Sequence, residues 1–98
     1  MVVHIVMIKF TEHPEKAQRI REAADRIEGL LGKVPSLERM ETGVNFSPEE
    51  RAMDLVLTAT FADRQGLQEY AVHPEHLKVI DYLKQVTDYS KVVDYETV

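Results

Sequence analysis

Residues 2–10 constrain the fold of this chain more than any other segment. Every position from Val2 to Ile8 except His4 is apolar. Both alternations of a strand would therefore be hydrophobic, with one made up of Val2, Val6, Ile8 and Phe10 and the other of Val3, Ile5 and Met7. Because successive side chains of a strand point to opposite faces, the segment is predicted to be a strand buried on both faces.

Helical and strand-like patterns follow in a regular order. Apolar side chains recur at spacings of three and four over residues 14–32, which predicts a helix that begins near Pro14 and is stopped by Gly32. Strands are predicted at residues 37–44, 53–61 and 89–96. The clearest of them is residues 53–61, in which the side chains of Leu55, Leu57, Ala59 and Phe61 point to the same side.

A broken helix is predicted between the last two strands. Asp63 can cap its first part, whose inner side is formed by Leu67, Tyr70 and Ala71. The helix should break at His73-Pro74, because the residue before a proline disfavours the helical conformation. A second part then starts at Pro74 and turns inward Leu77, Ile80, Leu83 and Val86.

The resulting order is β-α-β-β-α-β, which indicates an α+β, ferredoxin-like fold. Two right-handed split units of this kind give a four-stranded antiparallel sheet with both helices on one face. The other face would include Val3, Ile5, Met7, Val56 and Thr58. A chain of 98 residues cannot leave such a face in water, so we expect a homodimer that packs sheet against sheet.

Composition excludes several classes of function. The length corresponds to a single domain spanning residues 1–98. The formal net charge of -5 argues against nucleic-acid binding and against an anionic membrane surface, and no apolar run is long enough to span a bilayer. Cysteine is absent, which excludes thiolate chemistry and is compatible with the cytoplasmic location that we expect.

Tyrosine and histidine are concentrated in the run Tyr70-Ala-Val-His73-Pro74-Glu-His76. A histidine can take a proton α to a carbonyl near neutral pH, and a tyrosine hydroxyl can stabilise the resulting enolate. Tyr70 and His76 could therefore be a general acid and base. The alternative is structural: Tyr70 packs on the core, and His76 bonds to backbone groups freed by the helix break.

Other residues could complete a site between the sheet and the helices. His4, Leu55 and Leu57 have inward parity on their strands, and His73 lies beside the helix break, so we expect all four to contact a ligand. His73 and His76 also have a spacing that can present two imidazoles to a metal. Pro74 interrupts the helix between them and no third ligand is near in sequence, so no metal site is expected.

Four segments, in this order, carry a resemblance to a known family: His4-Ile-Val-Met-Ile-Lys9-Phe10, Met53-Asp-Leu-Val-Leu-Thr-Ala-Thr-Phe61, the tyrosine and histidine run, and Val93-Asp94-Tyr95. Together they resemble the stress-responsive dimeric α/β-barrel family, called Dabb. The resemblance covers nearly the whole chain. It implies a ferredoxin-like fold whose dimer closes two sheets into a barrel, with relatives among monooxygenase-like domains and cofactor-free polyketide cyclases.

The resemblance also implies a role for particular residues. One plant branch resembling this family catalyses an aldol cyclisation with a tyrosine and a histidine of this run, which correspond to Tyr70 and His76, with His4 as a neighbour. That branch lines its pocket with aromatic residues of the first helix. Here the inner face of that helix carries Ala24 and Ile27, so the pocket for a long polyketide is in doubt.

Two functions from different classes follow, and the sequence leaves open whether the chain is an enzyme. The first is a cytoplasmic Dabb-type homodimer that is stress-associated or binds a small apolar or carbonyl ligand. The alternative is a cofactor-free cyclase, lyase or isomerase acting on a polyketide-like carbonyl substrate, with His76 as base and Tyr70 as acid. An oxygenase without haem or flavin is a third hypothesis, based on fold analogy alone. No cofactor is expected. A cavity containing Tyr70 and His76 would favour the enzyme.

Overall fold

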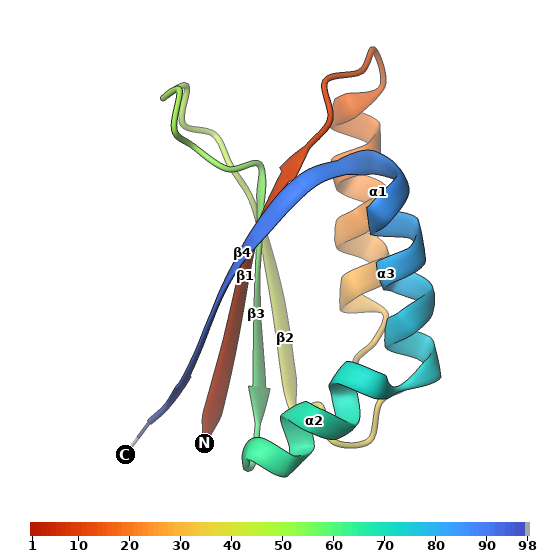
Figure 1. Ribbon diagram of the computed structural model, residues 1–98, viewed down its shortest axis with the longest axis vertical. Coiled ribbons are helices and arrows are strands. Elements are labelled where there is room, and N and C mark those ends of the chain that lie inside the picture. The colour runs from red at the N-terminus through yellow and green to blue at the C-terminus, as the bar shows by residue number, and fades with distance from the viewer. Residues whose placement is uncertain (98) are drawn as a thin grey trace.

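The computed structural model describes residues 1–97, which form a four-stranded antiparallel sheet with helices on one side (Figure 1). The elements in chain order are β1 (Val2–Phe10), α1 (Lys16–Glu28), β2 (Arg39–Val44), β3 (Leu55–Phe61), α2 (Arg64–Val72), α3 (Pro74–Val86) and β4 (Thr87–Glu96). The strand order is β2-β3-β1-β4, so β1 is interior and β4 is an edge. The predicted ferredoxin-like fold is confirmed, with its second helix divided into α2 and α3.

The two alternations of β1 point to different environments. Val2, Ile8 and Phe10 face the helices and are buried in the core. The neighbouring strand β3 repeats the pattern, since Leu55, Leu57, Ala59 and Phe61 are all buried. These side chains meet the inner face of α1, where the buried residues are Ile20, Ala23, Ala24 and Ile27.

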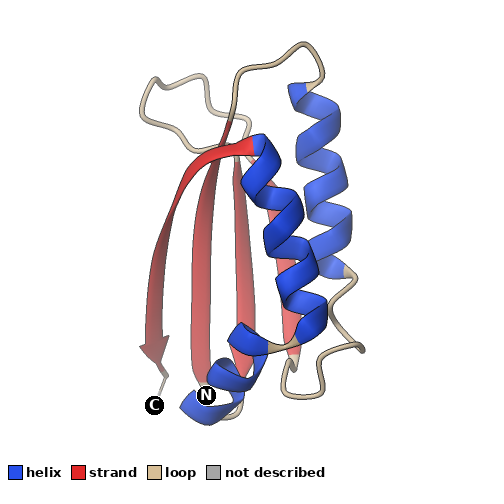
Figure 2. Ribbon diagram, turned by 45° about the vertical axis from the view of Figure 1, so that its right-hand side comes forward, coloured by secondary structure: helices blue, strands red, loops and turns tan. Residues whose placement is uncertain are grey.

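The opposite side of the sheet is not covered by any helix (Figures 1 and 2). Cross-strand pairing assigns its residues, because directly opposed side chains point to the same face. Ile5 pairs with Thr58 on one side and Val93 on the other, and Met7 pairs with Val56 and Lys91. We call this surface the open face and define it by Val3, Ile5, Met7, Val56, Thr58, Tyr89, Val93 and Tyr95.

The helix break lies where the sequence predicts it. α2 ends at Val72, and α3 begins at Pro74, whose missing N–H suits the first position of a helix. Between them His73 is extended, with φ -66° and ψ 135°, and its Nδ1 accepts a hydrogen bond from the Glu75 backbone N–H at 3.1 Å. α2 therefore lies across one end of the sheet while α3 runs beside α1 (Figure 1).

Some predicted boundaries and orientations were wrong. α1 ends at Glu28 instead of continuing to Gly32, because residues 29–37 form turns that bury Leu30, Val34 and Leu37. Gly32 lies in these turns with φ 93°, a value that favours glycine. The strands begin at Arg39, Leu55 and Thr87 instead of residues 37, 53 and 89.

Two residues predicted to face inward are exposed. These residues are Ala71 and Leu77, and the exposed fraction of Leu77 is 46%. The rest of the predicted inner side of α3 is largely confirmed, since Val86 is buried and Leu83 packs against the core, and the buried position that the prediction missed is Val79. Among residues 1–97, none of the helices has the length and hydrophobicity needed to cross a membrane.

Candidate functional site

A cavity of about 350 Å³ lies between α3 and the helix-facing side of β1, β3 and β4. Its apolar wall consists of Val6, Ile8, Leu57, Ile80 and Leu83. Its polar residues are His4, Tyr70, His76, Lys84, Thr87 and Ser90. A small, mostly apolar pocket with a few polar groups is the usual form of a small-molecule site.

The break at Pro74 brings the two residues of the tyrosine and histidine run together. Tyr70 comes from the last turn of α2, and His76 from the first turn of α3. Their ring centroids are 4.1 Å apart with an angle of 33° between the planes. An unbroken helix would place residues six apart on different sides, so the change of direction between α2 and α3 produces this contact.

Tyr70 lies at the centre of an aromatic cluster. Its ring centroid is 5.2 Å from that of Phe61 and 6.1 Å from that of His4, and the residue is only 2% exposed. The hydroxyl makes no hydrogen bond to residues 1–97, yet no side-chain polar atom in this part of the chain is both fully buried and unpaired. The hydroxyl must therefore reach open space, which is the cavity that Tyr70 lines.

Burial also fixes the protonation state of Tyr70. It raises the pKa of the phenol to about 12, so the hydroxyl keeps its proton across the physiological range. A protonated hydroxyl facing a mostly apolar cavity can donate a hydrogen bond to a ligand oxygen, such as that of a carbonyl group.

The hydrogen bond of His76 selects one tautomer. Its Nδ1 lies 3.1 Å from the carbonyl oxygen of Ala71, and because a carbonyl oxygen only accepts, Nδ1 carries the proton. Nε2 is then an acceptor with a free lone pair. Burial lowers the pKa of His76 below its ordinary value of 6.5, the nearby His4 and His73 lower it further, and the bond to Ala71 partly offsets these effects. His76 is therefore neutral at pH 7 and can act as a base.

His4 has a partner that the sequence did not reveal. It pairs with Asp94 on β4 in the strand register, and its Nδ1 forms a short contact with the Asp94 carboxylate. Only Asp94 among the Val93-Asp94-Tyr95 residues has the parity to reach His4. The sequence signal for this contact was an acidic residue in the otherwise apolar stretch after Val92. Predicting the contact from it would have required the register between β1 and β4.

Some of the residues predicted to contact a ligand line the cavity, and others lie outside it. His4, Leu57, Tyr70 and His76 all line the cavity. Leu55 is 1% exposed and lies in the core outside it, and His73 also lies outside because its ring caps α3. Ile80, Lys84 and Ser90 line the cavity although the sequence analysis did not assign them to a site. No three histidine, aspartate or glutamate side chains of residues 1–97 are placed to hold a metal ion together.

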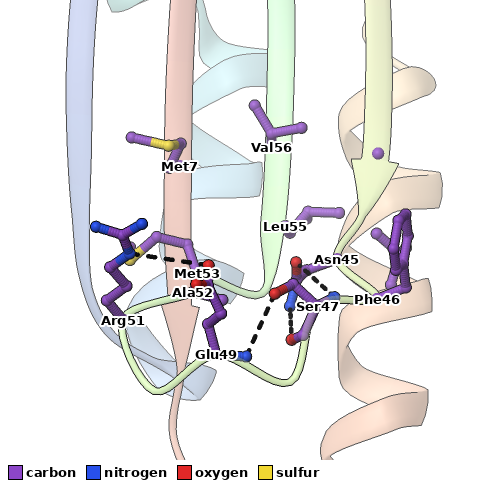
Figure 3. A pocket seen from close by; sticks show the side chains of 12 residues that line it. Met7, Asn45, Phe46, Ser47, Glu49, Arg51, Ala52, Met53, Leu55 and Val56 are labelled. Carbon is purple, nitrogen blue, oxygen red and sulfur yellow. Dashed lines mark hydrogen bonds and ion pairs between the residues drawn. The ribbon is translucent and has the colours of Figure 1, made fainter.

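A second, larger hollow of about 520 Å³ lies on the open face. Met7 and Val56 of the strands form its floor, and the loop of residues 45–54 surrounds it with Phe46 on one side and Arg51 on the other (Figure 3). The loop is internally braced, because Asn45 bonds to the backbone of Ser47 through both ends of its amide. Phe46 is 97% exposed on this braced loop.

Comparison with known families gives one match over residues 2–97, to the family described as Stress responsive A/B Barrel Domain. No protein of curated function is significantly similar in sequence to the chain.

Several solved structures are similar to this one. A dimeric protein of unknown function with a ferredoxin-like fold from Bacteroides fragilis is 28% identical, with a TM-score of 0.88 over 98% of this chain and 95% of that chain. A dimeric ferredoxin-like protein of unknown function from Jannaschia is 29% identical, with a TM-score of 0.80 over 98% of each chain. A hydroxynitrile lyase from Passiflora edulis shares the fold at 15% identity and a TM-score of 0.75, over 96% of this chain and 90% of that chain.

Proposed function

Since this chain belongs to the Stress responsive A/B Barrel Domain family, we propose that it is a homodimer that binds a small apolar ligand with a carbonyl group in the cavity beside α3. The observation that carries the proposal is the meeting of Tyr70, His76 and His4 at a mostly apolar cavity of about 350 Å³. A cytoplasmic location is part of the proposal and is compatible with the absence of cysteine.

The polar atoms at the cavity favour a carbonyl over a hydrocarbon ligand. Tyr70 offers a hydroxyl donor that has no partner in residues 1–97. His76 and His4 each use Nδ1 for a protein contact, to Ala71 and Asp94 respectively, and leave Nε2 for a ligand. A carbonyl oxygen accepts from the Tyr70 hydroxyl, and the chain next to it can contact Leu57 and Ile80.

Binding of the aldehyde nonanal tests this function. Calorimetric titration should detect binding to the parent protein, and Tyr70→Phe should weaken it about three- to ten-fold through loss of one hydrogen bond. Tyr82→Phe is the matched control, because Tyr82 lies on α3 but does not line the cavity. If nonanal does not bind, or binds equally to Tyr70→Phe, the carbonyl site is disproved.

The same geometry supports a second function, which is acid and base catalysis on the bound carbonyl compound. Nε2 of His76 would take a proton from the carbon α to the carbonyl. The electron pair of the broken C–H bond would move to the carbonyl oxygen, where the Tyr70 hydroxyl donates a hydrogen bond. This is the first step expected of a cofactor-free lyase, cyclase or isomerase. A hydroxynitrile lyase with this fold is a neighbour at the level of fold alone.

Hydrogen exchange in the ligand tests the catalytic function without knowledge of the natural substrate. In heavy water, proton removal by His76 and return of a deuteron would label the α carbon of nonanal, which NMR can follow. Labelling should be faster with the parent protein than in buffer, and His76→Ala should remove the acceleration. Labelling at the buffer rate would leave the protein as a binder only.

The homodimer is proposed to form through the open face. Its exposed apolar residues include Met7, Tyr89, Val93 and Tyr95, and apolar side chains gathered on one surface are typical of a protein–protein interface. The neighbours from Bacteroides fragilis and Jannaschia are described as dimeric, which supports the same assembly here. Sedimentation of the parent protein at micromolar concentration should give a dimer, and a stable monomer would disprove this part of the proposal.

A further inference from the structure

We infer that the ligand carries a carboxylate at the end opposite its carbonyl group, which makes it a medium-chain oxo acid whose anionic end pairs with Lys84. This inference rests on the proposed function, because it takes Tyr70 and His76 to bind the carbonyl end. It adds a second binding position to the cavity and names the chemical class of the ligand.

The cavity is long, and its polar residues lie at its two ends. His76, Ile80 and Lys84 follow one another at intervals of four along α3, so one side of the helix lines the cavity from its first turn to its last. The eight residues from His76 to Lys84 span about 12 Å at the helical rise. On the sheet, His4 lies opposite Asp94 and Ile8 lies opposite Ser90, which gives a similar distance of about 13 Å.

The middle of the cavity suits an unbranched chain. Between the two ends, its walls are the apolar side chains of Val6, Leu57, Ile80 and Leu83. A volume of about 350 Å³ spread over a length of about 12 Å leaves a narrow cross-section. The ligand is therefore expected to be an elongated molecule.

Lys84 differs from the other lysines of the chain in having no partner within residues 1–97. Four lysines form ion pairs with carboxylates, namely Lys9, Lys16, Lys33 and Lys78. Lys91 lies over the ring of Tyr89. Lys84 has neither kind of contact although the sequence contains 17 acidic residues, and it lines the cavity. An unpaired cation at the end of an apolar cavity favours a ligand with an anion at that position.

Ser90 adds a donor at the same end. Its hydroxyl makes no hydrogen bond to the part of the chain that the structure describes, and it lines the cavity beside Thr87. The Thr87 hydroxyl already uses its proton, because it donates a hydrogen bond to the Leu83 carbonyl oxygen at 2.7 Å. A carboxylate has two acceptor oxygens, and Lys84 and Ser90 together supply a charged and a neutral donor.

Lys84 also has a structural role that the experiment must separate from binding. It lies in the last turn of α3, where a cation offsets the negative end of the helix dipole. That role predicts a loss of thermal stability on substitution. It predicts no difference between charged and neutral ligands.

The test compares nonanoate with nonanol, which have the same chain length and differ in charge. The parent protein should bind nonanoate about three- to ten-fold more tightly than nonanol in calorimetric titrations at low salt. Lys84→Gln should remove this preference, so that nonanoate and nonanol bind to the variant with similar affinity. Lys78→Gln is the control, because it removes the same charge from the same helix at a position outside the cavity, and it should keep the preference.

The outcomes separate this inference from the proposed function. Equal affinity for nonanoate and nonanol in the parent protein overturns the anionic end, even where nonanal still binds in a Tyr70-dependent manner. If Lys84→Gln retains the preference for nonanoate, the anionic end is also overturned, and Lys84 has its structural role only. If Lys84→Gln removes the preference but the parent protein does not bind nonanal, the anionic position is retained and the carbonyl function is rejected.

Discussion

Ile8 and Met7 are neighbours on β1, yet Ile8 is 3% exposed and Met7 is 42% exposed. Both side chains are apolar, and they differ only in the face of the sheet to which they point. On β1 and β3 the helix-facing side of the sheet is covered by helices of the same chain, whereas the open face has no cover within residues 1–97. The comparison separates what one chain can bury alone from what it leaves for a partner.

The two faces also differ in chemistry. Tyr70, His76 and His4 all lie on the helix-facing side, at one end of a mostly apolar cavity, and Asp94 contacts His4 on that side. The open face carries apolar and aromatic side chains together with charged ones such as Lys91 and Glu41, and it has a hollow next to the braced loop of residues 45–54. Our proposals therefore assign ligand binding to one face and assembly to the other, and each of the following experiments tests that division.

The largest effect is expected from a charge on the open face. Ile5→Asp would place a carboxylate at the centre of the proposed dimer interface, where leaving a charge buried and unpaired costs about 3–5 kcal/mol. Sedimentation should then show a monomer or an unfolded chain. Val72→Asp is the control, because Val72 is exposed on α2 and lies away from the open face, and this variant should remain dimeric. An unchanged dimer in Ile5→Asp would assign assembly to another surface.

A smaller effect is expected from the loop beside the hollow. Phe46→Ser removes a ring that is exposed in the single chain, so the stability of each subunit should not change. If the loop packs on the second copy, the substitution removes about 1.5–3 kcal/mol of apolar burial per ring and weakens the dimer about ten-fold or more. Dilution experiments on the parent and the variant measure the difference. Equal dissociation constants would place Phe46 outside the interface.

On the covered face, Tyr70→Phe should leave the fold almost unchanged. The hydroxyl makes no hydrogen bond within residues 1–97, so its removal should change the free energy of unfolding by less than about 1 kcal/mol. The dimer should also be unaffected, since Tyr70 is on the opposite side of the sheet from the open face. Chemical denaturation and sedimentation check both expectations. A loss well above this value would mean that the hydroxyl has a structural partner.

The smallest effect concerns pH and His76. Burial lowers the pKa of His76 in the folded state below 6.5, so the unfolded chain binds more protons in the window between the two pKa values. The contribution of this group to stability is therefore complete above about pH 6.5 and is lost as the pH falls through the folded-state pKa. Thermal melts from about pH 8 to about pH 5 should show a decline that is smaller in His76→Ala.

His13→Ala serves as the control for that titration, because His13 is exposed and does not line the cavity. It should retain the pH dependence of the parent protein. A decline of the same size in His76→Ala and in the parent would assign the pH dependence to other groups.

Sequence patterns predicted the parts of this fold that depend on short spacings. The alternation in residues 2–10 and 53–61 assigned faces to the strands, and the His73-Pro74 pair located the helix break. The same parity placed His4 and Leu57 at the cavity, and the helix break placed Tyr70 and His76 there. The exact orientation of α3 was not predictable, because it depends on the direction that the chain takes after Pro74, so Leu77 is exposed while Val79 is buried.

Asp94 and Lys84 show a different limit. The contact of Asp94 with His4 depends on the register between the first and last strands, and a shift of one residue would turn Asp94 to the open face. Lys84 becomes distinctive only when the partners of the other lysines are known. Both properties arise from tertiary pairing, which composition and periodicity do not specify.

The interior position of β1 also determines when this sheet can be completed. The pairing of β1 is complete only when both of its partners are available, namely β3, which begins at Leu55, and β4, which ends at Glu96. During synthesis, β1 emerges before both of its partner strands and remains unpaired on one edge until β4 has left the ribosome. Such long-range pairings slow folding and expose hydrophobic strand edges to other chains. We therefore expect nascent chains of this protein to depend on chaperones more than helical domains of the same length.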